Sequence, residues 1–210
     1  MYIRFFKRLC DFCISLICSI IFLPIFIILI IVVKLDSKGP VFFRQERVGK
    51  DKKLFHILKF RTMKVDTPKE IPTCMLENPE QYITRVGKFL RKTSLDELPQ
   101  IWNILAGQMS LIGPRPVIPG EKELIAERDL YGANDIRPGL TGWAQINGRD
   151  EVSWKEKARL DGEYVQKMSF SFDVKCFFKT IVAVLKREGM VEGTAGQSKN
   201  KEETHQTDER

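Results

Sequence analysis

The most continuous apolar stretch of this chain runs from Phe12 to Val33 and contains no charged side chain. At a helical rise of about 1.5 Å per residue, a stretch of this length reaches across a hydrocarbon core of about 30 Å. Ile, Leu and Phe dominate it, as expected for a segment in contact with lipid. We therefore predict a membrane helix within residues 1–38.

Pro24 stands near the middle of this stretch, where it removes one backbone hydrogen bond and bends a helix. Basic residues flank the stretch on both sides, namely Arg4, Lys7, Arg8, Lys34, Lys38, Arg44 and Arg47. Because Lys- and Arg-rich flanks stay in the cytoplasm, both ends are drawn to the same side of the membrane. A re-entrant helix broken at Pro24 satisfies both flanks. A single straight span is the alternative.

The remaining pattern predicts a folded domain over 39–188. Residues 41–63 read as a β-hairpin around a polar turn at 49–53, and the proline-containing stretch from Val65 to Tyr82 reads as a loop. Apolar spacing predicts helices near 84–92, 95–106, 121–131 and 152–168, and a short strand at 144–147 after a turn-rich segment at 137–143. The predicted fold class is α+β, mainly helical, with a disordered polar tail over 189–210.

Residues 172–188 carry an amphipathic pattern of a different kind. An apolar stripe is opposed by basic residues; the stripe comprises Val174, Phe177, Phe178, Ile181, Val184 and Leu185, and the bases are Lys175, Lys179, Lys186 and Arg187. A basic amphipathic helix of this sort often lies in the membrane interface. We expect an interfacial helix here, with ordinary packing against a core as the alternative.

The basic composition of the chain predicts an anionic binding partner. The 210 residues carry a formal net charge of +7 and a pI near 9.2. Nucleic acid, anionic lipid and phosphorylated substrates all satisfy such a charge. The two histidines, His56 and His205, are too few and too far apart to predict a metal cluster.

Two adjacent carboxylates, Asp96 and Glu97, follow Ser94 in a run that reads as the start of a helix. Ser94 with Glu97 three residues later matches the capping-box pattern. A helix N-terminus favours anions, so a carboxylate held there should stay ionised and a phosphate should bind nearby. Arg91 and Arg115 stand close by, and the planar guanidinium group bonds two phosphate oxygens at once. The alternative is that Glu97 only caps the helix and Asp96 only complements its dipole.

These carboxylates belong to the first of three long motifs that follow one another along the chain. The motifs span residues 94–103, 109–116 and 137–149, and Lys59-Phe60-Arg61-Thr62-Met63 precedes them. Their order and spacing closely resemble the bacterial sugar transferases, the monotopic phosphoglycosyl transferases that start lipid-linked glycan assembly. The resemblance covers residues 1–188.

The resemblance implies a reaction, a cofactor and a location. The expected reaction moves a sugar 1-phosphate from a UDP-sugar to polyprenyl (undecaprenyl) phosphate and releases UMP. Asp96 is expected to attack the β-phosphate and form a covalent phosphosugar intermediate, beside Glu97 and with Mg²⁺ as cofactor. The catalytic domain is expected on the cytoplasmic face of the bacterial inner membrane, supplying downstream glycosyltransferases, with no nucleic-acid partner.

The resemblance also assigns further site residues. The expected substrate-binding residues are Arg91, Arg115, Arg137 and Arg149, joined by Lys59 and Arg61, which either contact phosphate or brace the acidic pair. Asp161 matches a family position near the active site and is expected, with Glu97, to meet the metal. Carboxylate and phosphate oxygens are the ligands that Mg²⁺ prefers.

Two rival functions remain open on the sequence. One is a membrane-anchored, non-catalytic module that binds lipid or nucleic acid, to which a basic chain with aromatic residues interleaved on a strand also leads. The apolar stretch from Phe12 to Val33 argues against the nucleic-acid version. The other is an enzyme that transfers the sugar without its phosphate, which would release UDP instead of UMP.

Overall fold

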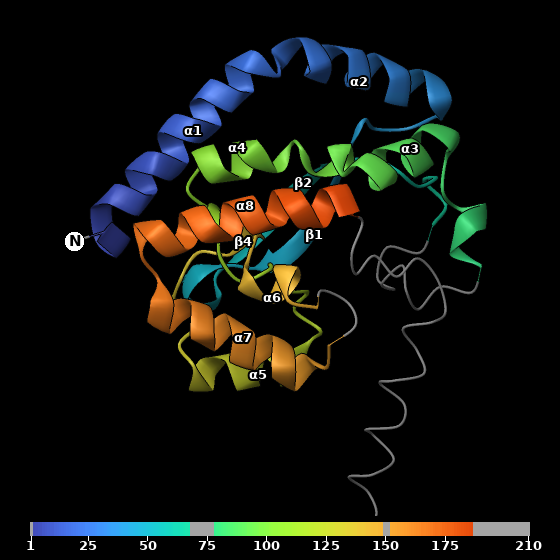
Figure 1. Cartoon of the computed structure of the whole chain (residues 1–210). Coiled ribbons are helices and arrows are strands. Elements are labelled where there is room, and N and C mark those ends of the chain that lie inside the picture. The colour runs from blue at the N-terminus through green and yellow to red at the C-terminus, as the bar shows by residue number, and fades with distance from the viewer. Residues whose placement is uncertain (1, 68–77, 149–151, 187–210) are drawn as a thin grey trace, which may run out of the picture.

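A computed structural model describes residues 2–67, 78–148 and 152–186 (Figure 1). Within these ranges the chain is mostly helical, with two small two-stranded sheets, so the predicted α+β, mainly helical class is confirmed. The predicted tail at 189–210 lies outside the described residues, as do most of the proline-containing loop and Arg149.

The N-terminal apolar stretch folds as two helices in an arch (Figure 1). A π-helical turn, η1 (Tyr2–Phe6), leads into α1 (Lys7–Ile21), and α2 (Leu23–Asp36) follows at a bend of 63°. Among the described helices, none by itself is long and apolar enough to cross a bilayer, whereas this bent pair has the length and composition together. Pro24 lies in the first turn of α2, where its missing N–H is tolerated, so the break predicted at this proline is confirmed.

Most of the arch presents apolar side chains to its surroundings. Exposed large apolar residues of α1 and α2 are Leu9, Phe12, Ile14, Leu16, Ile17, Ile20, Ile21, Leu23, Ile25, Ile27, Ile28, Ile31, Val32 and Leu35. Three residues of α2, Phe26, Leu29 and Val33, instead face the rest of the molecule and are buried. One side of the arch is therefore packed and the other is left without a protein partner among the described residues.

The predicted hairpin is confirmed. Strands β1 (Phe42–Val48) and β2 (Leu54–Phe60) pair antiparallel, from Phe42 opposite Phe60 to Val48 opposite Leu54, around the 3₁₀ turn η2 (Lys50–Lys52). Its aromatic end packs under the arch, where Phe42 stacks on Phe60 with ring centroids 5.4 Å apart. The opposite end lies in a separate apolar cluster with Val117 and Leu124.

Two helices lie directly beneath the arch (Figure 1). The first, α3 (Arg85–Thr93), follows the 3₁₀ turn η4 (Pro79–Gln81) and is capped by the Thr84 side chain, which accepts from Gly87 N at 2.9 Å. The second, α4 (Gln100–Leu105), packs against α1. The helix predicted at 84–92 is confirmed.

The second sheet corrects the prediction for residues 137–147. Strand β3 (Ser110–Ile112) pairs in parallel with β4 (Gly139–Thr141) inside the segment expected to be turns, and the expected strand at 144–147 is mostly the short helix α6 (Trp143–Ile146). Glycines make this pairing possible. A Cβ atom at Gly139 would lie 2.1 Å from Gly113 N, so only a chain without side chains there can approach this closely.

Helices α5 (Lys122–Leu130) and α7 (Trp154–Lys167) pack together at the end of the molecule farthest from the arch (Figure 1). Both helices were predicted and are confirmed, with small differences at their ends. The last described helix, α8 (Phe170–Lys186), confirms the predicted helix at 172–188 over its described part.

Helix α8 is packed on one side and exposed on the other. Cys176 is fully buried, and Asp173 accepts hydrogen bonds from Tyr2 and Lys7 at 2.6 Å and from Tyr164 at 2.7 Å. The exposed side carries the apolar residues Phe170, Val174, Phe177, Phe178, Ile181 and Val182. The Asp173 contacts tie the beginning of the arch to α7 and α8.

The close contact at Gly139 generates a testable prediction. Gly139→Ala places a methyl group against backbone that cannot move without separating β3 from β4, and overpacking of this kind costs about 1–3 kcal/mol. We expect a lower apparent melting temperature for the purified protein. Gly120→Ala is the control, because a Cβ atom there meets no heavy atom within 4 Å. Equal melting temperatures for the two variants would contradict the observed pairing.

Candidate active site

The two adjacent carboxylates lie in a tight turn between two helices, not at a helix N-terminus. Asp96 and Glu97 belong to the 3₁₀ helix η5 (Leu95–Glu97), which follows α3 directly. Ser94, the expected N-cap, ends α3 with a left-handed backbone (φ 55°), and its side chain makes no capping hydrogen bond. The predicted capping box is therefore wrong, because Ser94 terminates one helix instead of starting the next.

Pro99 explains why the predicted helix at 95–106 is divided. Proline has no N–H to continue the hydrogen-bond ladder, so α4 begins after it, and Trp102 N donates to Pro99 O at 3.0 Å. The turn before it is held by 3₁₀-type bonds, including Glu97 N to Ser94 O at 3.2 Å. The acidic pair thus lies on a constrained backbone between α3 and α4.

Lys59 of β2 fixes the side chain of Glu97. Its Nζ atom lies 2.7 Å from Glu97 Oε1, and both side chains are largely shielded from solvent. A charge-assisted hydrogen bond in such surroundings is stronger than an exposed ion pair. Glu97 is therefore held in a defined orientation by the hairpin, as the prediction that Lys59 braces the acidic pair requires.

The pKa of Asp96 is raised to about 6. Burial of its carboxyl group is the main cause and the neighbouring Glu97 charge adds to it, while Lys59 and Arg91 oppose the shift. The expectation that a helix N-terminus would keep this group readily ionised is thus not met at this position. At pH 7, about one pKa unit above this value, roughly nine-tenths of the Asp96 side chains are still ionised.

Arg91 precedes the turn that carries Asp96 and Glu97, here called the acidic turn, and Arg115 follows it in the sequence. Arg91, in the last turn of α3, donates from Nε to Thr62 Oγ1 at 2.9 Å and contributes a positive charge near Asp96. Arg115 follows β3 in the second motif and lines a pocket together with Lys59 and Glu97. The β3–β4 pairing brings the loop that carries Arg115 close to the acidic turn. The close approach of Gly113 and Gly139, which permits this pairing, therefore helps to form the pocket.

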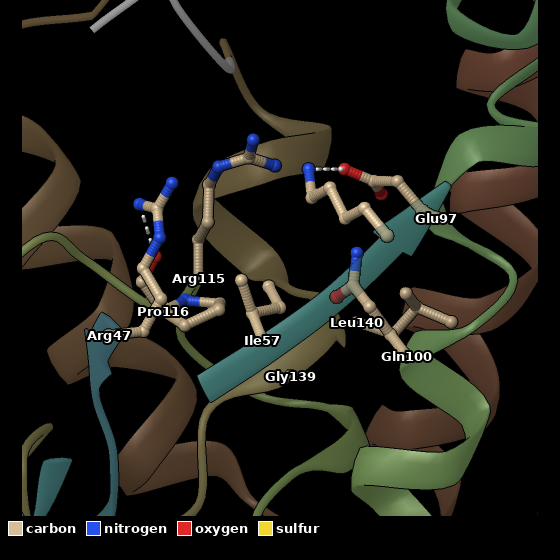
Figure 2. A pocket seen from close by; sticks show the side chains of 9 residues that line it. Arg47, Ile57, Glu97, Gln100, Arg115, Pro116, Gly139 and Leu140 are labelled. Carbon is tan, nitrogen blue, oxygen red and sulfur yellow. Dashed lines mark hydrogen bonds and ion pairs between the residues drawn. The ribbon is translucent and has the colours of Figure 1, made fainter. Parts of the chain in front are cut away.

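The pocket contains further residues that the sequence did not assign to it (Figure 2). Arg47 of β1 and Gln100 at the start of α4 line it, and Figure 2 shows Arg47 beside Arg115 and across the pocket from Glu97. On the sequence, Arg47 was assigned to the basic flank of the membrane segment. The alternation of β1 places Arg47 on the same face as Phe43 and Gln45, and this strand pattern was the available signal that Arg47 belongs to the hairpin.

Three of the predicted site residues have other partners. Arg61 is buried and donates from Nη2 to Ser37 O at 2.6 Å, so it holds the C-terminal end of α2 instead of lining the pocket. Arg137 donates from Nε to Gly107 O at 2.8 Å, just after α4. These bonds anchor Nη2 of Arg61 and Nε of Arg137 to backbone carbonyls, and the assignment of the two arginines to substrate binding stays a prediction.

Asp161, the third, is enclosed between α5 and α7. It has no exposed surface, and its Oδ2 atom accepts from Arg128 Nε at 2.8 Å. Arg128 in turn donates to Arg115 O at 3.0 Å, so this buried pair supports the loop that carries Arg115. In the structure Asp161 therefore supports the backbone of the Arg115 loop through Arg128, and its expected role as a metal ligand stays a prediction.

The acidic pair itself is a candidate donor set for Mg²⁺. Among the described residues, no group of three or more His, Cys, Asp and Glu side chains gathers as a metal site. Mg²⁺ is usually held by one or two carboxylates together with substrate phosphates and water, so Asp96 and Glu97 beside a pocket lined by Arg47, Lys59 and Arg115 fit this ion. The fit requires a diphosphate ligand to complete the coordination.

The far end of α4 is held by the arch. Arg8 of α1 donates to Ile104 O at 2.6 Å and to Leu105 O at 2.8 Å, which satisfies carbonyls that a helix end leaves unpaired. Asp11, also in α1 and buried, accepts from Leu111 N at 3.0 Å. The arch therefore contacts the helix that follows the acidic turn and the strand that precedes Arg115.

Comparison with known proteins identifies the family to which this chain is similar. Residues 2–187 match the family described as bacterial sugar transferase. The chain is 41% identical over 201 residues to the UDP-galactose-lipid carrier transferase of Erwinia amylovora, covering 89% of this chain and 42% of that protein. It is 40% identical over 185 residues to the UDP-glucose:undecaprenyl-phosphate glucose-1-phosphate transferase of Escherichia coli K12, covering 85% and 40%.

A shorter relative is matched over most of its length. The uncharacterized sugar transferase EpsL of Bacillus subtilis is 41% identical over 186 residues, which cover 88% of this chain and 89% of that protein. The chain spans about two fifths of the two longer curated relatives. The family match extends over nearly the whole chain and includes every motif around the acidic turn. This chain therefore belongs to the bacterial sugar transferase family.

Proposed function

We propose that the chain is a phosphoglycosyl transferase that moves a sugar 1-phosphate from a UDP-sugar to polyprenyl phosphate and releases UMP. The observation that carries this proposal is the acidic turn: a half-buried Asp96 beside Glu97, with Lys59, Arg91 and Arg115 around it. Phosphoryl transfer depends mainly on positioning and on neutralising charge on the phosphate oxygens. The names of the Erwinia and Escherichia coli relatives support the same donor and acceptor classes.

Asp96 is the proposed nucleophile. A carboxylate oxygen of Asp96 forms a bond to the β-phosphorus of the donor, the bond from that phosphorus to the oxygen shared with the α-phosphate breaks, and UMP leaves with the electron pair. A phosphate oxygen of the polyprenyl phosphate then attacks the same phosphorus and releases Asp96 as a carboxylate. Covalent catalysis of this kind divides one difficult transfer into two easier ones.

Glu97 and the cations around it complete the proposed machinery. Lys59 fixes Glu97 through the 2.7 Å ion pair, while Arg91 and Arg115 supply positive charge near the phosphates. When Mg²⁺ is bound by the acidic pair and the diphosphate, it offsets charge on the phosphate oxygens. The side chains of the chain itself then position the reacting carboxylate and keep its neighbour oriented.

The bent helix pair is the proposed membrane anchor, in a re-entrant arrangement. At about 1.5 Å per residue, α1 and α2 are each roughly 20 Å long, which is shorter than a hydrocarbon core of about 30 Å. Both ends of the pair bond to the same folded body: Lys7 to Asp173 in α8, and Asp36, which accepts from Val86 N in α3. Because both ends of the helix pair are attached to the same folded domain, these contacts support a segment that enters and leaves the same leaflet of the membrane.

The exposed apolar sides of α1, α2 and α8 support a location at the cytoplasmic face of the bacterial inner membrane. Helix α8 carries Lys175 and Lys179 beside its apolar residues, which suits an interface with anionic lipid. Such a position places the acidic turn where a water-soluble donor and a lipid acceptor can both reach it. Downstream glycosyltransferases would then use the lipid-linked sugar.

The nucleophile is tested by release of UMP. We expect the wild-type protein, given a panel of UDP-sugars with polyprenyl phosphate and Mg²⁺, to release UMP from at least one of them, and Asp96→Asn to reduce that rate by more than a thousand-fold. Asp135→Asn, an exposed aspartate, is the matched control and should keep the wild-type rate. Release of UDP would favour transfer without the phosphate, and no release of either nucleotide would favour a binding module.

The re-entrant arrangement is tested by accessibility. In a cysteine-free background, Lys38→Cys and a cysteine placed in an N-terminal tag should both resist a membrane-impermeant maleimide in intact spheroplasts and react after lysis. Gly120→Cys on the folded body serves as the cytoplasmic reference. Labelling of the tag from outside would show that the segment spans the membrane.

The electrostatic surroundings of Asp96 are tested by its titration. In metal-free protein, the carboxyl ¹³C resonance that Asp96→Asn removes should titrate with a midpoint near pH 6, because burial and Glu97 disfavour the charged form. Glu97→Gln should lower that midpoint, since it removes one negative charge and frees Lys59 from its partner. Glu46→Gln, exposed on β1, should not change it. A wild-type midpoint below pH 4 would contradict the buried position.

A further inference from the structure

Arg47 has no part in the mechanism above, yet its guanidinium group lines the same pocket (Figure 2). Its Nη1 atom donates to Pro116 O at 3.2 Å and its Nη2 atom to Gln45 Oε1 at 2.6 Å. Its Nε atom is buried and has no hydrogen-bond partner among the described residues. An unsatisfied charged donor at the wall of a pocket costs free energy unless a ligand accepts its hydrogen bond.

Arg115 stands beside it and is also available. Its side chain is exposed and makes no hydrogen bond or ion pair to any described residue, while its backbone is held by Arg128. Burial is the main cause that lowers the pKa of Arg47 to about 10, and the neighbouring charge of Arg115 lowers it further, while Glu121 and Glu97 oppose the shift. An anion between the two groups would relieve both costs.

Glu97 of the acidic turn acts on Arg47 only as a nearby negative charge, and no hydrogen bond between the two is found. Glu97, the carboxylate that lines the pocket with both arginines, is bonded to Lys59 at 2.7 Å. Figure 2 shows Arg47 and Glu97 at opposite sides of the pocket, with Arg115 between them. The pocket therefore has one side with the Glu97–Lys59 ion pair and a second side with the guanidinium groups of Arg47 and Arg115.

The position of Arg47 along β1 indicates which phosphate this second side receives. Phe42, at one end of the strand, packs under the arch, whereas Val48, next to Arg47, packs in the cluster with Val117 and Leu124. Five residues of extended chain separate Phe42 from Arg47, or about 16 Å. The second side thus faces away from the apolar helices, toward the water from which a soluble nucleotide arrives.

We propose that Arg47 and Arg115 form a subsite for the α-phosphate of the donor, and so hold the phosphate of the departing UMP. This inference rests on the proposed function. As Asp96 bonds to the β-phosphorus and the bond to the bridging oxygen breaks, the electron pair and negative charge pass to that oxygen, which leaves on UMP. Two guanidinium groups aimed at this phosphate stabilise the charge where it develops.

The subsite is tested first by equilibrium binding of UMP, which needs no turnover. We expect Arg47→Gln and Arg115→Gln each to weaken UMP binding roughly ten- to a hundred-fold by isothermal titration, as loss of a hydrogen bond to a charged group predicts. Arg44→Gln is the matched control: it lies on the same strand, is exposed, and removes the same unit of charge. It should change UMP affinity less than two-fold.

A second variant separates binding from folding. Arg47→Lys keeps the charge and most of the stem but lacks the Nε donor, so it should fold and still bind UMP several-fold more weakly than wild type. Melting temperatures of all variants identify any loss of fold, and Arg47→Lys decides the question if Arg47→Gln does not fold. UMP affinities of Arg47→Lys and Arg115→Gln equal to that of Arg44→Gln would overturn the subsite.

Steady-state kinetics distinguish the donor from the lipid acceptor as the source of the phosphate. The inference predicts a higher KM for the UDP-sugar and a lower kcat in Arg47→Lys, with an unchanged KM for polyprenyl phosphate. A raised KM for the acceptor alone would assign the arginines to the lipid phosphate and contradict the inference. If the wild-type protein releases no UMP, the proposed function fails; if it does while these variants match Arg44→Gln, only the subsite fails.

Discussion

The rest of the structure depends on the packing of Phe26, in the arch, against Trp102 and Phe60. The rings of Phe26 and Trp102 are stacked with centroids 4.8 Å apart, and Phe26 lies 5.9 Å from Phe60. Trp102 belongs to α4 and Phe60 ends β2, so one buried ring joins the arch, the helix after the acidic turn and the strand that carries Lys59. Aromatic pairs of this kind stabilise the fold by more than the burial of their apolar surface alone would give.

This packing determines where the acidic turn lies. Helix α4 packs against the arch at Trp102, and Arg8 of the arch donates hydrogen bonds to the last carbonyls of this helix. The first residue of α4, Gln100, then lines the pocket. The β3–β4 pair, held at Leu111 by Asp11, brings Arg115 to the same pocket. The pocket therefore has the apolar contacts beneath the arch on one side and a wall with Arg47 and Arg115 on the other, which suits the proposed reaction between a lipid and a nucleotide sugar.

Local patterns predicted the elements well, and contacts between distant residues decided what the patterns missed. The hairpin, the break at Pro24 and the helices near 84–92, 121–131 and 152–168 follow from short-range periodicity and proline chemistry. The strand at 139–141 was missed because it forms only through close approach of Gly113 and Gly139. Family motifs led to Lys59, Arg91, Arg115 and the acidic pair, but they could not reveal that Arg61 and Asp161 bond to partners 24 and 33 residues away.

The central claim is that Asp96 becomes covalently bonded to the sugar phosphate. Intact-protein mass spectrometry tests it most directly, on protein incubated with a UDP-sugar that it uses, in the absence of polyprenyl phosphate. The account predicts a mass increase of one sugar phosphate, located by digestion to the peptide that contains Asp96, and loss of that increase when the acceptor is added. UMP release and lipid product without any such adduct, or an adduct on another residue, would contradict it.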